Sequence, residues 1–241
     1  MAGRFKSLKQ AVINEATALG GVIADFVRTR TAAGRRIFCA AGCSNCCTLF
    51  VQATLAEALN VAAGLTAPQV HKLEEYVLRQ REIFAGESDF LSILRQQRAA
   101  LGPCPFLDDS GCCSIYAQRP LACHALLSTK PAEWCSVDFS SLDSLEKRLY
   151  RESLEREVVA FPVHYVACTQ DAAQAAEARL LAEMEAKIGA AISGNFPLLV
   201  YLARTLTASS QDGVVNWPQQ LASSPFFHPL LLEIRTNNTN L

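Results

Sequence analysis

Apolar side chains recur at three- and four-residue steps along several segments of this chain of 241 residues, and that spacing is the period of an α-helix. The longest such run, residues 7–31, predicts one amphipathic helix that leads into a cysteine-rich segment. Charged runs rich in Ala, Glu and Leu at 142–159 and 171–192 predict further helices, as does a more apolar run at 198–206. The pattern is therefore that of a mainly helical protein.

Two helix start signals of the same kind follow the cysteine-rich segment. Thr54-Leu-Ala-Glu57 and Thr66-Ala-Pro-Gln69 both place a hydroxyl three residues before Glu or Gln, which is the capping-box pattern. Gly64 lies between them as a stop signal, so we expect a pair of helices. Ser88 or Asp89 is expected to cap the next helix.

Strand signals are thin. The stretch 106–116 predicts a small hairpin that turns at Asp108-Asp-Ser-Gly111, and no other segment favours a strand. The predicted fold class is mainly α, a helical domain with irregular cysteine-rich metal-binding loops and at most a small β-hairpin. We expect a cysteine-cluster metal-binding domain with its N-terminal helix at 1–136, and a helical C-terminal region at 137–241 packed on it as one unit.

Composition and charge narrow the class of protein. Half of the residues are hydrophobic, so a chain of this length can fold around an ordinary core without a metal. The 22 basic and 23 acidic side chains give a net charge of -1, which argues against a general nucleic-acid binder. Three uncharged windows, 37–56, 188–203 and 214–232, are interrupted by polar residues or prolines, and we expect no membrane span and no membrane partner.

Ten cysteines are the strongest chemical signal in the chain. Because the chain is long, apolar and helical in pattern, and its first residues lack an uninterrupted apolar signal segment, we expect a reducing cytoplasmic location and not a disulfide scaffold. Thiolates this close together attract zinc or an iron–sulfur cluster. The clustering favours as ligands Cys39, Cys43, Cys46, Cys47, Cys104, Cys113 and Cys123.

Three further cysteines are less clear. Cys112 adjoins Cys113 and leaves the register of one ligand open, and Cys135 stands between ligand and packing residue. Cys168 lies alone in an apolar run and is interpreted as a small buried hydrophobe. The adjacent pair Cys46-Cys47 indicates a cluster or two ions, because neighbouring side chains leave the backbone in different directions.

A thiolate centre of either kind carries about two negative charges, so cations are expected near it. Arg119, Arg35, Arg36 and His124 are the candidates. The remaining polar residues favour plainer roles. His71 and His228 are expected at the surface or in caps, His164 in the core, and Asp108 with Asp109 in a turn.

The combination Cys39-x3-Cys43-x2-Cys46-Cys47, then Cys104-Pro-Phe-Leu-Asp, then Cys113-Ser-Ile-Tyr-x2-Arg-Pro-Leu-x-Cys123 resembles the YkgJ-type cysteine-cluster family. That family is described as a zinc- or iron-chelating domain. The resemblance covers about residues 37–125 and implies that the seven motif cysteines are ligands, with Cys135 as a later member. Where the family commonly has Arg after the last motif cysteine, this chain has His124, an imidazole able to ligate or to hydrogen-bond sulfur.

The family pattern states a metal site and not a reaction, so two functions stay open. In the first, the protein binds an iron–sulfur cluster or zinc for a structural, redox or metal-handling purpose. In the second, it is an iron–sulfur enzyme, because related cysteine-cluster proteins include flagellin lysine N-methylases that use S-adenosylmethionine. The Cys39-x3-Cys43-x2-Cys46 spacing also matches the radical S-adenosylmethionine loop, although the β/α alternation of a barrel is missing. The expected partner is a metal ion or cluster, and no protein partner is indicated.

Overall fold

The computed structural model describes residues 2–209, 216–236 and 239–240. Within these ranges the protein is mainly α, as predicted, with a small antiparallel sheet. The helices are α1 (Ala2–Ala32), α2 (Leu55–Ala62), α3 (Ala67–Phe84), α4 (Phe90–Gln96), α5 (Leu121–Ala125), α6 (Ser144–Glu152), α7 (Ala167–Ile188), α8 (Phe196–Ser209) and α9 (Trp217–Ala222). The strands are β1 (Gln52–Thr54), β2 (Ala190–Asn195), β3 (Leu232–Thr236) and β4 (Thr239–Asn240).

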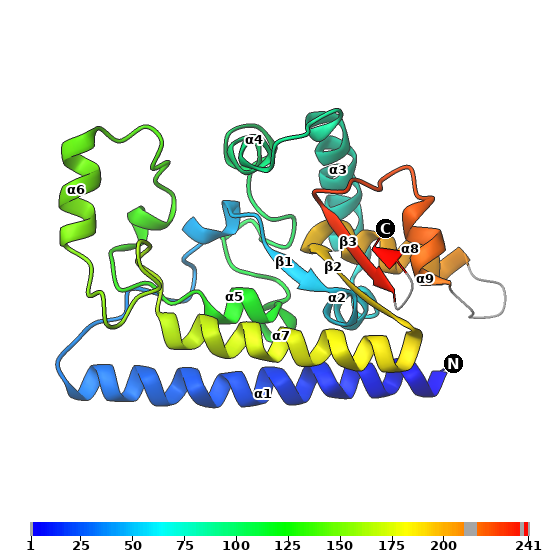
Figure 1. Ribbon diagram of the computed structural model, residues 1–241, viewed down its shortest axis with the longest axis horizontal. Coiled ribbons are helices and arrows are strands. Elements are labelled where there is room, and N and C mark those ends of the chain that lie inside the picture. The colour runs from blue at the N-terminus through cyan, green and yellow to red at the C-terminus, as the bar shows by residue number, and fades with distance from the viewer. Residues whose placement is uncertain (1, 210–215, 237–238, 241) are drawn as a thin grey trace.

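The two longest helices, α1 and α7, pack side by side along one edge of the molecule (Figure 1). Leu8, Val12 and Leu19 form the buried stripe of α1, which confirms the helical period read from the sequence. Arg179 of α7 also donates to both carboxylate oxygens of Glu15, at 2.9 Å from Nε and 2.7 Å from an η nitrogen. Among the described helices, none is long and apolar enough to cross a membrane.

Both predicted capping boxes are present. At the start of α2, Thr54 Oγ1 accepts from the backbone N–H of Glu57 at 3.3 Å, and the Glu57 carboxylate accepts from the Thr54 N–H at 2.7 Å. Thr66 and Gln69 form the same motif at the start of α3. Asp89 caps α4 through the N–H groups of the following turn, as one of the two predicted capping residues.

The sheet has the order β1-β2-β3-β4, with every pair antiparallel. None of these strands was predicted from the sequence, and β2 takes the place of the end of a helical run that was predicted to reach residue 192. Gly189, with φ +75°, ends α7 in the left-handed conformation, and the apolar residues that follow form β2, which is buried along its whole length. A similar correction applies to 142–159, where α6 ends at Glu152.

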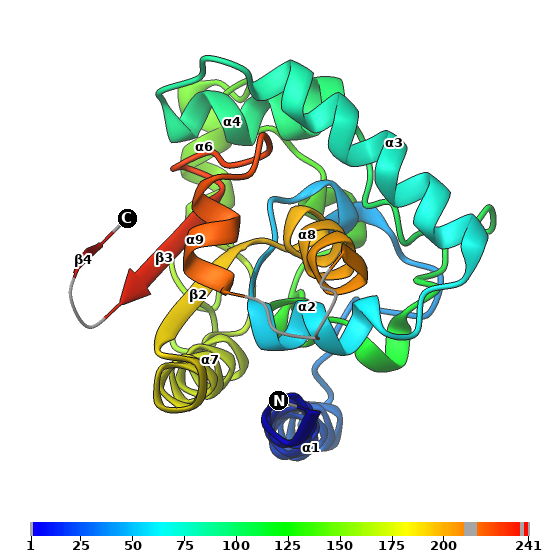
Figure 2. The same ribbon diagram turned by 90° about the vertical axis from the view of Figure 1, so that its right-hand side faces the viewer.

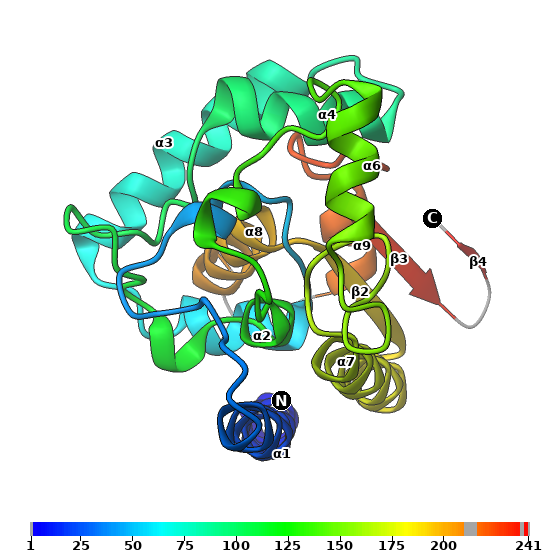
Figure 3. The same cartoon turned by 90° about the vertical axis from the view of Figure 1, so that its left-hand side faces the viewer.

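One apolar core joins segments from both sides of residue 136. It includes Leu55 of α2, Phe106, Leu180 of α7 and Ile192 of β2, all nearly inaccessible to solvent. In Figure 2, α2 and α8 lie to the right of β2 and β3 and above α1. A smaller cluster joins Tyr150 of α6 with Leu154 and Val159. In Figure 3, α6 faces the viewer, at the end of the molecule away from β3.

Candidate metal centre

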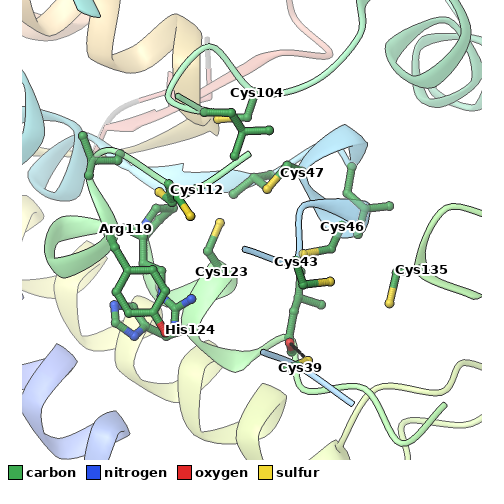
Figure 4. Close-up of a pocket in the computed structure, with 18 of the residues that line it drawn as sticks. Cys39, Cys43, Cys46, Cys47, Cys104, Cys112, Arg119, Cys123, His124 and Cys135 are labelled. Atoms are coloured by element: carbon green, nitrogen blue, oxygen red, sulfur yellow. Dashed lines mark hydrogen bonds between the residues drawn. The ribbon is translucent and has the colours of Figure 1, made fainter. Parts of the chain in front are cut away.

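All eight cysteines that the sequence analysis placed at a metal site line a single cavity of about 510 Å³ (Figure 4). Cys112 lines it as well, so nine of the ten cysteines meet there, and all ten are free thiols. Cys168 lies outside the cavity and is exposed, so the interpretation of Cys168 as a buried hydrophobe is wrong. The fold therefore brings together thiols that are up to 96 residues apart in the sequence, from Cys39 to Cys135.

The first cysteine cluster is a knuckle and not a helix. Gly42 has φ +80°, a conformation that favours glycine, and it turns the chain between Cys39 and Cys43. A single 3-10 turn, Asn45–Thr48, then carries Cys46 and Cys47. The sequence left both geometries open, and the short turn presents the adjacent cysteines in different directions.

The second cluster lies on a tight loop. Asp108 closes this loop because its Oδ1 accepts from the N–H groups of Ser110 and Cys112, both at 2.9 Å. Leu107 and Cys113 form an isolated antiparallel bridge, which is the predicted hairpin in its shortest form. The Cys104 N–H donates to the Cys47 carbonyl at 2.9 Å, so the two clusters are joined directly through the backbone.

Cys123 and His124 lie on the short helix α5, whose start is held by Glu57. The Glu57 carboxylate accepts from the Leu121 N–H at 2.8 Å while also accepting from Thr54. Burial raises the pKa of this carboxyl and the hydrogen bonds from Thr54 and Leu121 oppose that effect. One buried side chain therefore links the start of α2 to the helix that carries Cys123.

The two oxygens of the Glu57 carboxylate accept from the backbone N–H groups of Thr54 and Leu121, whereas a glutamine amide has only one accepting oxygen. We therefore predict that Glu57→Gln lowers the free energy of unfolding by about 1–3 kcal/mol. Thermal unfolding followed by circular dichroism measures the effect. The control is Glu152→Gln, because the side chain of Glu152 is 60% exposed and its ion pair with Arg148 is long at 4.0 Å. Equal melting temperatures for the two variants would contradict the role assigned to Glu57.

The cavity environment holds most of its thiols in the protonated form. Burial raises the pKa of Cys104 to about 12, and it raises the pKa of Cys123 well above the ordinary value. The pKa of Cys46 is raised first by its hydrogen bond with Cys47 and then by burial. A metal that binds here has to displace protons, and thiolate–metal bonds provide the free energy for that exchange.

Arg119 and His124, two of the candidates for a nearby cation, line the cavity. The Arg119 guanidinium lies 4.1 Å from the centre of the Tyr116 ring, and His124 Nε2 is buried without a hydrogen-bond partner among the described residues. Burial and the charge of Arg119 lower the pKa of His124 to about 4, so its imidazole is neutral at physiological pH. Arg35 and Arg36 do not line the cavity.

Cys135 has a partner that the sequence analysis did not connect with it. Its Sγ lies 3.4 Å from Nε2 of His164, whose Nδ1 lies 2.9 Å from the Tyr150 hydroxyl. A hydroxyl that donates to Nδ1 leaves the ring proton on Nε2, facing the sulfur. His164 is a core residue as predicted, but its contact spans 29 residues and no local spacing signals it.

The other polar candidates have the roles expected of them. His71 is exposed, with its Nε2 3.3 Å from the Glu75 carboxylate, and His228 accepts from the Leu230 N–H as a cap. No motif in the sequence indicated the non-thiol side of the cavity, where Tyr76, Asn195 and Phe196 form part of the wall. Only the packing of α3, β2 and α8 brings these residues to the site.

The donor set fits a soft metal or a cluster. Among the described residues, no three Cys, His, Asp or Glu side chains converge on one point at ligand distance. The thiols instead line the cavity, together with the Nε2 atom of His124, which has no hydrogen-bond partner among the described residues. Sulfur-rich sites of this kind select zinc or iron–sulfur clusters over magnesium or calcium.

Fold and site together define a helical, cysteine-cluster metal-binding protein. Residues 38–139 match the family model CxxCxxCC, described as "Putative zinc- or iron-chelating domain". The match confirms the resemblance seen in the motifs and supports zinc or iron–sulfur as the cofactor. The match leaves α1 and the helices from α6 onward outside it. No curated protein and no solved structure matches the chain.

Proposed function

We propose that this protein holds an iron–sulfur cluster or zinc through Cys39, Cys43, Cys46, Cys47, Cys104, Cys113, Cys123 and Cys135, for a structural, redox or metal-handling purpose. The observation that carries the proposal is the gathering of all eight thiols around one cavity. Arg119 supports it as the nearby cation that a negatively charged thiolate centre needs. The thiols have to stay reduced to bind metal, so we place the protein in the cytoplasm.

Between the two metals, the iron–sulfur cluster is preferred. Eight thiols exceed the four that one tetrahedral zinc accepts, and the adjacent residues Cys46 and Cys47, which both line the cavity, suit a centre with several metal atoms. When bound, an iron–sulfur cluster supplies one-electron redox chemistry. His164 has the matching role of a donor toward the Cys135 sulfur, and hydrogen bonds of this kind tune cluster potentials.

Anaerobic purification followed by an absorption spectrum and analysis for iron, sulfide and zinc tests both levels of the proposal. We expect a coloured protein with iron and acid-labile sulfide in equal amounts. A colourless protein with stoichiometric zinc would overturn the choice of iron and keep metal binding. A reduced, folded protein that takes up neither metal would overturn metal binding itself.

The enzyme alternative rests on a different observation, the apolar part of the cavity wall. Val51, Tyr76 and Phe196 line the same space as the thiols, and about 510 Å³ lies in the range of small-molecule pockets. In this alternative the site is an iron–sulfur enzyme related to S-adenosylmethionine-dependent lysine methylases. Calorimetric titration of the metal-loaded protein with S-adenosylmethionine tests it, and the absence of binding would remove the alternative.

A further inference from the structure

The eight candidate ligands fall into two groups, because different backbone segments hold the cysteines on the two sides of the cavity. On one side lie Cys39 and Cys135, which are tied to the neighbouring residues Ser128 and Thr129. The Ser128 N–H donates to Cys39 Sγ at 3.2 Å. Thr129 donates from its N–H and its hydroxyl to the carbonyl of His164, whose Nε2 lies 3.4 Å from the Cys135 sulfur. The two sulfurs are therefore held by the same short segment.

On the other side, Cys104 is the centre of a second group. Its N–H bonds to the Cys47 carbonyl, and its own carbonyl accepts from the Leu107 N–H at 3.2 Å. Leu107 in turn forms the bridge with Cys113. Cys123 comes from α5, and Figure 4 shows its sulfur on the side of Cys47, away from Cys39 and Cys135.

The adjacent pair Cys46 and Cys47 lies at the boundary. In a 3-10 turn neighbouring side chains point about 120° apart, so the two sulfurs can serve different metal atoms. Figure 4 shows Cys43 and Cys46 on the side of Cys39 and Cys135, and Cys47 next to Cys104. The turn that carries the pair also packs against the turn Ala132–Cys135.

We infer that the cavity contains two adjacent four-thiolate sites. The Cys135 set consists of Cys39, Cys43, Cys46 and Cys135. The Cys104 set consists of Cys47, Cys104, Cys113 and Cys123. The inference rests on the proposed function, and it adds the number of metal centres and the division of ligands between them. Each set supplies the four sulfurs that one tetrahedral zinc or one [4Fe–4S] cluster requires.

Two double variants test the division. Cys39→Ser/Cys135→Ser removes two ligands of the Cys135 set, and Cys104→Ser/Cys123→Ser removes two of the Cys104 set. The control is Cys168→Ser, which replaces a thiol that is exposed and lies outside the cavity. Metal per chain is measured on anaerobically purified protein, with circular dichroism to establish that each variant is folded.

We expect each site variant to retain half of the metal of the unchanged protein and the control to retain all of it. Complete loss in either folded site variant would show one shared centre and overturn the inference. An unchanged protein that binds no metal at all would contradict the proposed function instead, so the two failures are distinguishable.

If a site variant does not fold, titration of the reduced, unchanged chain with Co²⁺ decides the same question. Two tetrahedral thiolate-bound ions per chain are expected from the absorption bands that thiolate–cobalt bonds produce. Saturation at one ion per chain would overturn the inference.

Discussion

Gly194→Ala is expected to lower the free energy of unfolding by at least about 3 kcal/mol, which for a chain of this size is a fall in melting temperature of roughly 6–12 °C. Gly194 lies in the central strand β2, paired with Ala53 of β1 and Leu232 of β3. A Cβ at this position would be 2.3 Å from the Leu231 carbonyl oxygen and 3.0 Å from the Leu232 Cα. Both contacts are with backbone, so no side-chain rotation relieves them.

The effect should extend to the cavity. Asn195 and Phe196 directly follow Gly194 and line the site, and the Asn195 N–H donates to the Leu231 carbonyl at 2.7 Å. A displaced β2 therefore moves one wall of the cavity. Thermal unfolding measures stability, and metal analysis of the same sample measures the consequence at the site.

Gly21→Ala is the matched control. Gly21 is an exposed residue of α1, and a Cβ built there meets no atom within 4 Å. Replacing an interior helical glycine by alanine stabilises a helix by about 0.5–1 kcal/mol. The melting temperature should stay equal or rise slightly. A Gly194→Ala variant as stable as the control would contradict the close packing of β2 between its neighbours.

Local signals in the sequence predicted the helices well where one short pattern was sufficient. The capping boxes at Thr54 and Thr66 each need four residues, and both formed as read. The sheet has no such local signal. The segment Ala190–Asn195 is apolar, short and directly continuous with a helical run, and its strand state depends on pairing with β3 some forty residues later.

The candidate site shows the same division. Spacing within each cysteine cluster identified the thiols, because a knuckle and a tight loop are local structures. The contact of Cys135 with His164 and the approach of Tyr76 to the cavity depend on tertiary packing, so no spacing in the sequence predicts them. Cys168 was misjudged for the related reason that an apolar run on a helix has an exposed side as well as a buried one.

Cys46→Ser is expected to lower the affinity of the cavity for its metal by at least about 100-fold, because losing even a residue that only supports a ligand costs 10- to 100-fold. Cys46 shares the 3-10 turn Asn45–Thr48 with Cys47. Its charge contributes to the raised pKa values of Cys39, Cys104, Cys113, Cys123 and Cys135, after the larger effect of burial in each case. A serine hydroxyl at this position is a poor ligand for a soft metal.

Metal analysis and competition with a chromophoric chelator measure the loss, and Cys168→Ser is the control because its thiol is exposed and outside the cavity. The same change should destabilise the folded protein, since a metal present at about a thousand times its dissociation constant adds about 4 kcal/mol to the free energy of unfolding, and a 100-fold weaker site keeps only about 1.4 kcal/mol of that. In the presence of metal, the Cys46→Ser variant should therefore melt roughly 5–11 °C below the control. Equal metal content in the two variants would exclude Cys46 from the metal centre and would require a different interpretation of the cysteine cavity.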